Sequence, residues 1–296
     1  FEQLSDYIDQ DTVIASNTSA LSIEEMAKHL PYPENMVGIH FFNPVFKMSL
    51  VEVVKADSTS EASTSKAVEF VTRIGKAPVV VKDRPGFLVN RILVPYLNEA
   101  GHLLDEGYKM ETIDSALKNF GMPMGPIRLI DEVGIDVGYH VADHLSEALS
   151  HHYPLSDSFK EIFEDGLKGK KQGEGFYRGY DDGDEQPNPK YQPETPINDP
   201  DTKTIVRRLI NMMVAEAVRC LEEEIVEDAN QLDIAMILGT GFAPFRGGLL
   251  RHADNYGLSR IVDELEEFRE ECGSRYAVPE QLSNFAKRGE SFTREG

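Results

Sequence analysis

One apolar stripe at helical spacing occurs twice in this chain, and that repetition limits the folds open to its larger part. Adding 117 to each apolar position of the first stripe gives the second. The first stripe is Val89, Leu93, Tyr96, Leu97, Ala100, Leu103 and Leu104, and the second is Val206, Ile210, Met213, Val214, Ala217, Cys220 and Leu221. Each stripe covers one face of an amphipathic helix. Since repeated helical units bury these faces against each other, the region is expected to form one all-α bundle of two repeats.

Shorter matches extend the repeat, and a segment of different composition separates its copies. Ile113-Asp114 corresponds to Leu232-Asp233, and the offset grows to 123 where Gly134-Ile135 corresponds to Gly257-Leu258. Between the copies, residues 181–202 are acidic and rich in proline, as linkers are. The predicted limits are therefore 83–180 for the first repeat, 181–202 for the linker and 203–296 for the second repeat.

The first 82 residues have a different pattern, with short apolar runs alternating with helical stretches. The apolar runs cover residues 12–15, 37–42, 50–54 and 78–81, and the helical stretches between them cover 22–30 and 61–75. Runs that are apolar on both faces are typical of strands buried in an α/β sheet with helices on both sides. Residues 1–82 are therefore expected to form a sheet of the doubly wound type.

This sheet is expected to be partial. Residues 1–9 have a helical pattern with no strand before them, whereas a doubly wound domain needs about five or six strands. No G-x-G-x-x-G turn follows any predicted strand. The sequence therefore predicts that residues 1–82 are the C-terminal part of such a domain, without its phosphate-binding turn.

Composition excludes several classes of function. With 30 Lys plus Arg and 51 Asp plus Glu, the net charge is −21, which disfavours binding to nucleic acid or to anionic lipid. Two cysteines do not make a disulfide scaffold. No apolar run approaches the ~20 residues that span a bilayer, and no signal peptide opens the chain. We expect a soluble, cytoplasmic protein without membrane insertion.

Glu52 is the most informative single residue, because it lies in the apolar run LVEVV. A buried carboxylate costs several kcal/mol unless it is paired. If 37–42 and 50–55 pair antiparallel, residues whose numbers sum to 92 lie opposite each other, which places His40 opposite Glu52. A carboxylate that orients an imidazole is the usual arrangement for a histidine general base. The alternative is a structural core histidine with Glu52 on a sheet edge.

Polar residues follow two of the predicted strands. Ser16–Ser19 (SNTS) comes after the first strand, and Asn43 comes after Phe42. Ligands of α/β sheets bind at the carboxyl ends of strands, although ordinary turns have the same composition. Asn90 lies about a turn into a helix that is predicted to begin near Pro85 with Asp83 as its cap. An amide there could hold an oxygen that gains negative charge, and a solvent-facing asparagine is the alternative.

One basic cluster and one histidine pair complete the candidates. The glycines of residues 168–177 (KGKKQGEGFY) could bring backbone close to an anionic group, but a flexible turn is equally compatible with them. His151 and His152 are an isolated pair, and the cysteines lie far apart in sequence, so we predict no metal site.

Taken together, these motifs resemble the L-3-hydroxyacyl-CoA dehydrogenase family. The matching segments are Ser16–Ser19, GIHFFNP at 38–44 with LVEV at 50–53, DRPGFLVNR at 83–91 and GMPMGP at 121–126. The HFFNP block with LVEV at this spacing is highly specific, and the resemblance covers essentially the whole chain. It implies a Rossmann-type NAD-binding domain, here partial, followed by a duplicated helical domain like the C-terminal domain of 6-phosphogluconate dehydrogenase.

The resemblance also implies a role for each site residue. His40 would take the proton of the 3-hydroxyl group while hydride leaves C3 for NAD, and Glu52 would orient His40. Ser19 and Asn90 would hydrogen-bond the reacting oxygen, and Asn17 and Asn43 would lie near the nicotinamide. Because the glycine-rich turn is not in this sequence, we expect the isolated chain to bind NAD poorly and to be inactive.

The duplicated helices and the GEGFY run resemble the long, bacterial form of the family. That form is the multifunctional α subunit of the fatty acid β-oxidation complex, which also carries enoyl-CoA hydratase/isomerase activity and assembles with a thiolase β subunit. The resemblance thus implies an acyl-CoA substrate. Two alternatives remain at this point: a helical assembly or docking module without activity, and a related dehydrogenase of hydroxy acids or sugar acids.

Overall fold

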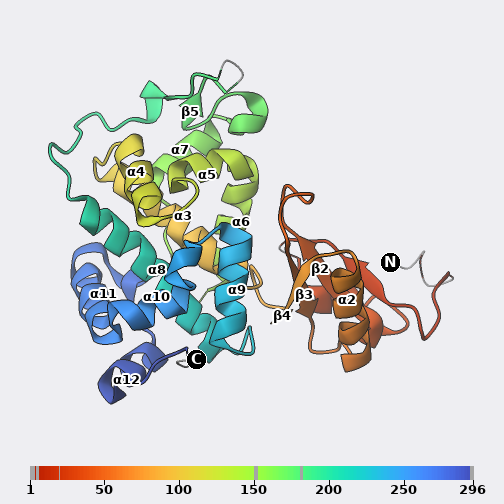
Figure 1. Ribbon diagram of the computed structural model, residues 1–296. Coiled ribbons are helices and arrows are strands. Elements are labelled where there is room, and N and C mark those ends of the chain that lie inside the picture. The colour runs from red at the N-terminus through yellow and green to blue at the C-terminus, as the bar shows by residue number, and fades with distance from the viewer. Residues whose placement is uncertain (1–3, 5–6, 20, 150–152, 181–182, 294–296) are drawn as a thin grey trace. The chain divides into compact units, whose positions relative to one another are not determined.

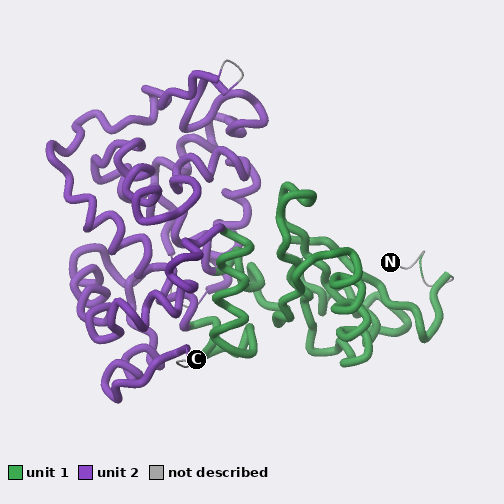
Figure 2. The backbone as a smooth tube through the Cα atoms, in the orientation of Figure 1, with its two compact units in different colours: residues 1–91, 219–240 green, residues 92–218, 241–296 purple. Residues whose placement is uncertain are grey.

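The computed structural model describes residues 4, 7–19, 21–149, 153–180 and 183–293, and the described chain forms two compact units. One unit contains residues 1–91 and 219–240, and the other contains residues 92–218 and 241–296 (Figure 2). Part of the second repeat therefore belongs to the same compact unit as the N-terminal sheet. The domain limits predicted from the sequence follow chain order and stay a prediction.

A four-stranded sheet forms the centre of the first unit (Figure 1). Its strands are β1 (Ile14–Ser16), β2 (Met36–Phe41), β3 (Leu50–Lys55) and β4 (Ala77–Lys82), in that spatial order. The β1–β2 and β3–β4 pairs are parallel, and the β2–β3 pair is antiparallel. All four predicted strands are present, with ends that differ by at most two residues. Most of the helix predicted at residues 1–9 lies outside the described residues.

The two faces of the sheet have different partners. Val37, Ile39, Val51 and Val53 point to one face and form a core with α2 (Glu61–Arg73). Because side chains alternate along a strand, the residues between them point to the other face. That other face contacts α1 (Ile23–Ala27) through β2 and α9 (Ala229–Thr240) through β3. It is also the face that carries His40 and Glu52.

Helices make up most of the second unit. In chain order the helices after β4 are α3 (Val89–Asp105), α4 (Met110–Phe120), α5 (Pro126–Val133), α6 (Ile135–Ala148), α7 (Asp157–Glu164), α8 (Thr202–Glu222), α9, α10 (Leu249–Tyr256), α11 (Leu258–Cys272) and α12 (Glu280–Arg288). The order α3 to α6 repeats as α8 to α11, as the sequence predicts. Gly134 and Gly257, at matching junctions of the two repeats, have φ values of 102° and 105°.

Short elements fill the rest of the described chain. They are β5 (Tyr177–Arg178), β6 (Gln186–Pro187) and the 3-10 helices η2 (Pro33–Asn35), η3 (Lys170–Gln172), η4 (Pro189–Tyr191), η5 (Pro244–Arg246) and η6 (Ser274–Tyr276). The described part of the predicted linker has no α-helix before Thr202, where α8 begins, but it packs against other parts of the unit. Tyr191 is buried, and the buried Asn188 donates to the Gly175 carbonyl at 3.0 Å.

Reciprocal contacts join the two repeats. Arg91 and Glu106 of the first repeat correspond to Arg208 and Glu223 of the second, at the same offset of 117. Arg91 Nη2 lies 2.7 Å from Glu223 Oε1, and Arg208 Nη2 lies 2.9 Å from Glu106 Oε1. The arginine of each repeat thus pairs with the glutamate of the other, which is the pattern of an isologous interface.

Close glycine contacts follow the same reciprocal pattern. A Cβ on Gly121 would lie 2.8 Å from the Ala243 side chain, and a Cβ on Gly241 would lie 2.7 Å from the Pro123 ring. Gly121 corresponds to Gly241, and Pro123 corresponds to Ala243. Both glycines also have positive φ, so a side chain at either position would be strained as well as crowded.

The glycines of the 168–177 cluster serve packing. A Cβ on Gly169 would lie 2.4 Å from the Asp131 carbonyl oxygen, and a Cβ on Gly175 would lie 2.1 Å from Asp131 Oδ1. The buried Asp131 carboxylate accepts from the backbone N–H groups of Phe176 and Tyr177. In the second repeat the equivalent Asp254 accepts from Phe292 and Thr293 in the same way. Lys170 and Lys171 form ion pairs with acidic side chains.

His252, on α10, is expected to make the second unit sensitive to acid. Burial, together with the charge of Arg246, lowers the pKa of His252 to about 4, whereas an unfolded histidine has a pKa near 6.5. As the pH falls from about 6.5 to 4, the unfolded state therefore takes up a proton that the folded state does not. The free energy of unfolding should fall by about 2 kcal/mol over this range, after allowance for partial exposure.

The variant His252→Leu tests this expectation, because the first repeat has Leu129 at the equivalent position. Urea unfolding curves at pH 7 and at pH 4.5 should differ less for the variant than for the parent chain. Asp114 opposes the effect in both proteins, since burial raises its pKa to about 6 and acid therefore stabilises the fold through it. An unchanged pH dependence in the variant would remove His252 as the cause.

Candidate active site

His40 and Glu52 lie opposite each other on β2 and β3, in the register whose numbers sum to 92. His40 Nδ1 is 2.7 Å from Glu52 Oε2. Both side chains are buried, and Glu52 is 0% exposed. A carboxylate only accepts hydrogen bonds, so the imidazole donates from Nδ1 and keeps the lone pair of Nε2 free for an incoming proton. The geometry is that of an oriented general base.

The second oxygen of Glu52 caps the start of α3. Glu52 Oε1 accepts from the backbone N–H groups of Leu88 and Val89, at 3.1 and 2.9 Å. These groups have no partner within the helix, and the positive end of the helix dipole favours a carboxylate. The cost of burying Glu52 is therefore offset by His40 on one side and by α3 on the other. The carboxylate can move little, and neither can the imidazole that it holds.

The turn between β4 and α3 positions the Leu88 and Val89 N–H groups toward Glu52. Gly86 and Phe87 both have positive φ, of 76° and 51°. Such a conformation is unusual for phenylalanine and is found where surrounding contacts enforce it. Phe87 is buried, with its ring centroid 5.7 Å from that of His40. The sequence predicts no role for Phe87 beyond its place in the DRPGFLVNR motif, whereas in the structure its ring packs beside His40.

Ser19 and Asn90 lie beside the free nitrogen of His40. Ser19 Oγ is 3.1 Å from His40 Nε2, and the Asn90 amide donates to the Ser19 carbonyl oxygen at 3.4 Å. Ser19 comes from the segment after β1, and Asn90 is the second residue of α3. The structure thus brings Ser19, His40, Glu52 and Asn90 together from four separate segments.

Asn17 and Asn43 occupy the strand ends where the sequence places them. Asn17 Oδ1 accepts from the backbone N–H of Phe41 at 3.0 Å, which ties the segment after β1 to the end of β2. Asn43 is exposed and precedes Pro44 through a cis peptide bond. Both side chains lie at the carboxyl ends of parallel neighbours, where ligands of α/β sheets bind.

Two expectations about the start of α3 are wrong. The helix begins at Val89, so Asn90 lies at its start and not a full turn inside it. Asp83 does not cap α3. Its Oδ2 accepts from Ser22 Oγ and from the Glu24 backbone N–H, both at 2.8 Å, and so holds the start of α1. The physical reason is that Glu52 already occupies the α3 donors.

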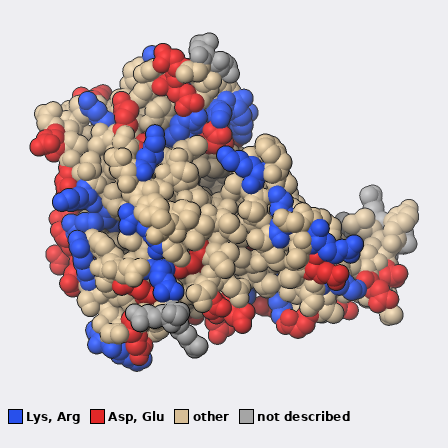
Figure 3. Space-filling view, viewed as in Figure 1, with Lys and Arg blue, Asp and Glu red and all other residues tan. Residues whose placement is uncertain are grey.

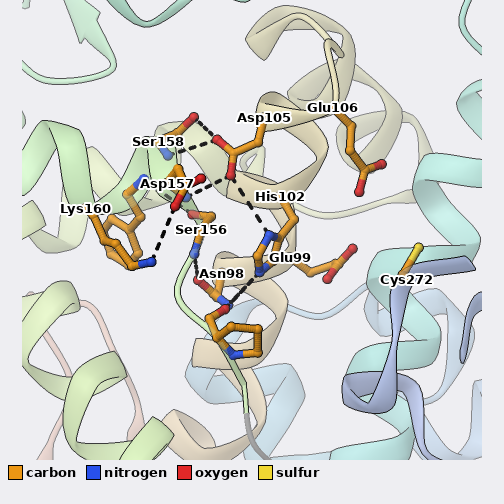
Figure 4. A network of polar contacts seen from close by, with 12 residues as sticks. Asn98, Glu99, His102, Asp105, Glu106, Ser156, Asp157, Ser158, Lys160 and Cys272 are labelled. Carbon is orange, nitrogen blue, oxygen red and sulfur yellow. Dashed lines mark hydrogen bonds and ion pairs between the residues drawn. The ribbon is translucent and has the colours of Figure 1, made fainter.

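A cavity of about 430 Å³ in the second unit is a weaker candidate site. Its lining includes Asp105, Glu106 and Lys190, but each of these has a structural partner. Asp105 accepts from the N–H groups of Asp157 and Ser158 at the start of α7, as Figure 4 shows. Glu106 pairs with Arg208, and Lys190 pairs with Asp165. These side chains maintain the fold of the second unit.

Other functional classes gain no support from the described residues. None of the described helices is long and apolar enough to cross a membrane. Among the described side chains, no group of three or more His, Cys, Asp or Glu is placed to hold a metal ion, and His151 and His152 lie outside that part of the chain. On the face seen in Figure 3, basic and acidic side chains are interspersed.

Comparison with known proteins decides the family. The NAD binding domain of 3-hydroxyacyl-CoA dehydrogenase matches residues 1–84, and the C-terminal domain of the same enzyme matches residues 86–179 and 205–296. The chain belongs to the 3-hydroxyacyl-CoA dehydrogenase family. Its fold is therefore a Rossmann-like NAD-binding domain followed by a helical C-terminal domain, as the sequence predicts at that level.

Curated relatives of this 3-hydroxyacyl-CoA dehydrogenase family member are considerably longer. The chain is 42% identical over 287 residues to the fatty acid oxidation complex subunit alpha of Vibrio parahaemolyticus. The aligned residues make up 95% of this chain and 40% of the relative. It is 40% identical over 291 residues to the protein of that name from Shewanella loihica, covering 96% of this chain and 41% of the relative. The chain thus spans about two fifths of the length of these relatives.

Solved structures agree with the family. 3-Hydroxybutyryl-CoA dehydrogenase from Escherichia coli superposes with a TM-score of 0.81 at 25% identity, covering 97% of this chain and 78% of that one. The dehydrogenase part of multifunctional enzyme 1 from C. elegans superposes with a TM-score of 0.64 at 27% identity, covering 95% and 66%.

Proposed function

We propose that this chain carries the centre that oxidises (S)-3-hydroxyacyl-CoA to 3-ketoacyl-CoA with NAD. The observation that carries the proposal is the buried His40–Glu52 pair, in which Glu52 is fully enclosed and the outer nitrogen of His40 remains available. Family membership supports the substrate class. A histidine with a purely structural role would not need a partner carboxylate whose second oxygen is held by backbone donors at the start of a helix.

Each of the four clustered residues has a defined part in this reaction. His40 Nε2 takes the proton of the 3-hydroxyl group, and Glu52 holds the tautomer and stabilises the imidazolium that results. Ser19 Oγ and the Asn90 amide hold the substrate oxygen within reach of Nε2. NAD, when bound, would supply the acceptor for the hydride that leaves C3.

The residues present fit the nicotinamide end of NAD. Asn17 and Asn43 offer amide groups at the carboxyl ends of β1 and β2, and the Asn17 oxygen is already held by Phe41 N–H, which fixes its amide. The printed sequence has no G-x-G-x-x-G turn after a strand to hold the pyrophosphate. We therefore propose that these 296 residues by themselves bind NAD poorly and are inactive.

The wider setting of the proposal rests on the relatives' name, which gives the complex, and on the family resemblance, which implies its other activities and its partner. We propose that the chain acts as the dehydrogenase part of a cytoplasmic fatty acid oxidation complex α subunit. Enoyl-CoA hydratase/isomerase activity would then lie outside these residues, and a thiolase β subunit would be the partner. The 42% identity to curated α subunits supports this setting.

Turnover of acetoacetyl-CoA with NADH, measured in a full α subunit that contains these residues, tests the proposal. His40→Gln should lower turnover by about 10³-fold, because the residue that exchanges a proton with the substrate oxygen is lost; in this reverse direction it acts as the acid. The control is His29→Gln, an exposed histidine of the same unit that should change nothing. Calorimetric titration with NADH measures the cofactor affinity of the 296-residue chain in parallel.

The outcomes separate the parts of the proposal. Equal turnover by the His40→Gln variant and the parent chain would refute the dyad as the catalytic centre. Micromolar NADH affinity would refute weak cofactor binding and leave the dyad in place. A chain that binds neither acyl-CoA nor NADH, yet binds the thiolase subunit, would favour the assembly-module alternative.

A further inference from the structure

The connection between β4 and α3, residues 82–91, supplies several parts of the candidate active site. It contributes the two backbone donors of Glu52, the Phe87 ring beside His40, and Asn90. A segment that carries so much of the site must itself be held in place. Its supports come from the second helical repeat, 130 or more positions further along the chain.

Residues 223–225 hold both ends of this connection. Lys82 N donates to the Ile225 carbonyl at 2.8 Å, and Lys82 Nζ lies 2.8 Å from Glu224 Oε2. At the other end, Arg91 makes a two-point ion pair with Glu223, with Nη2–Oε1 at 2.7 Å and Nη1–Oε2 at 3.1 Å. The Arg91 side chain is only 2% exposed, whereas that of Glu223 is 44% exposed, so the pair joins a buried guanidinium to a carboxylate at the surface.

At Gly239, α9 packs closely against the same region. A Cβ on Gly239 would lie 2.8 Å from Leu50 Cδ2 and 3.1 Å from Val89 Cγ2. Leu50 is two residues before Glu52 on the same face of β3, and Val89 N–H is one of the Glu52 donors. Gly239 is the last residue but one of α9, and the absence of a side chain there lets the end of this helix approach Leu50 and Val89 closely.

We propose that residues 219–240, which we name the second-repeat clamp, position the His40–Glu52 pair. Gly239 and Glu223 are its positioning residues, and they act through Val89 and Arg91. The inference rests on the proposed function, since it assigns the second repeat a part in that same site. The second repeat contains none of the proposed site residues. On this inference it is nevertheless needed to hold the site residues of the β4–α3 connection in place.

The His40 Nδ1–H proton gives a readout that does not depend on activity. Its hydrogen bond to a buried carboxylate should produce a downfield proton NMR signal in the full chain, assigned by its absence from His40→Gln. Glu223→Gln weakens the Arg91 pair and Gly239→Ala pushes α9 away from Val89. Both variants should move this signal and raise its exchange rate with water by about tenfold, the lower end of effects seen for supporting residues.

Glu106→Gln is a matched control. Glu106 is the repeat equivalent of Glu223, its side chain is 42% exposed against 44%, and its partner Arg208 is 5% exposed against 2% for Arg91. The same chemical change at Glu106 should leave the His40 signal where it is. Thermal unfolding of all three variants identifies any that fails to fold, and Glu223→Gln, which keeps the side-chain shape, remains informative if Gly239→Ala does not fold.

The results decide between positioning and general stability. Equal changes from Glu223→Gln and Glu106→Gln, or an unmoved signal in folded Glu223→Gln, would overturn the inference. With activity measured as well, turnover should fall about tenfold in Glu223→Gln with an unchanged KM for acetoacetyl-CoA. A moved signal together with normal turnover by His40→Gln would refute the proposed function but leave the clamp standing.

Discussion

Glu52→Gln is expected to lower turnover by about 10⁴-fold while the chain stays folded. The amide keeps the size of the side chain, and its oxygen can still accept from Leu88 and Val89. Its NH₂ group then faces His40 Nδ1, which must accept instead of donate. The imidazole proton moves to Nε2, where the substrate hydroxyl needs a lone pair, so the ring is held in the wrong tautomer.

The measurement is oxidation of (S)-3-hydroxybutyryl-CoA by NAD in a full α subunit that contains these residues, with circular dichroism as the check on folding. Glu61→Gln is the control, because Glu61 pairs with Lys55 in the same unit but its side chain is 83% exposed. That control should retain full turnover. A Glu52→Gln protein with more than about a tenth of the parent activity would show that the tautomer of His40 is not set by Glu52.

Arg208→Met is expected to destabilise the second unit by about 3 kcal/mol. Arg208 is buried, and its guanidinium pairs with Glu99 and Glu106. Glu99 is 1% exposed, so removal of Arg208 leaves a buried carboxylate with Arg275 as its remaining ion-pair partner. Desolvation of this kind costs far more than loss of a surface ion pair.

Urea unfolding at pH 7 measures this loss, and Glu99→Leu added to Arg208→Met should recover part of it, because the buried charge is then removed.

The contribution of Glu99 to the free energy of unfolding depends on pH with a definite sign. Burial raises the pKa of Glu99, but the charge of Arg208 and the Arg275 hydrogen bond outweigh it and hold the pKa below its usual value. The stability that this group contributes is lost as acid is added. If Arg208→Met lowers the free energy of unfolding by less than about 0.5 kcal/mol, the Arg208 ion pairs contribute no more than exposed ion pairs do.

The central pair of the site is predictable from the sequence for a simple physical reason. A carboxylate in an apolar strand needs a partner, and a short loop between two antiparallel strands leaves few registers to choose from. Those two constraints place His40 opposite Glu52, and the structure has that register. Ser19 and Asn90 were assigned through the family resemblance, because nothing in their local sequence separates a site residue from an ordinary polar turn.

The partners of the site residues are less predictable. Asp83 was assigned to the helix that follows it in sequence, whereas it holds α1, 59 residues earlier. The packing of residues 219–240 with the sheet is equally distant in sequence. Such contacts depend on how elements fold together and not on local propensity. One signal was present, since α9 is apolar on most of its surface and contains a glycine near its end.

The starts of the two repeats differ in a way that bears on how such a chain evolved. The α3 donors are occupied by Glu52 from the sheet, whereas at the start of α8 Asp201 accepts from Lys203 N–H and Thr204 Oγ1–H within its own segment. The start of the first copy thus depends on a carboxylate from the sheet, whereas Asp201 supplies acceptors for the start of the second copy from its own segment. If the proposed function and clamp are correct, a substitution in the first copy can alter the site directly, whereas one in the second copy reaches the site only through residues 219–240 and the ion pairs with the first copy.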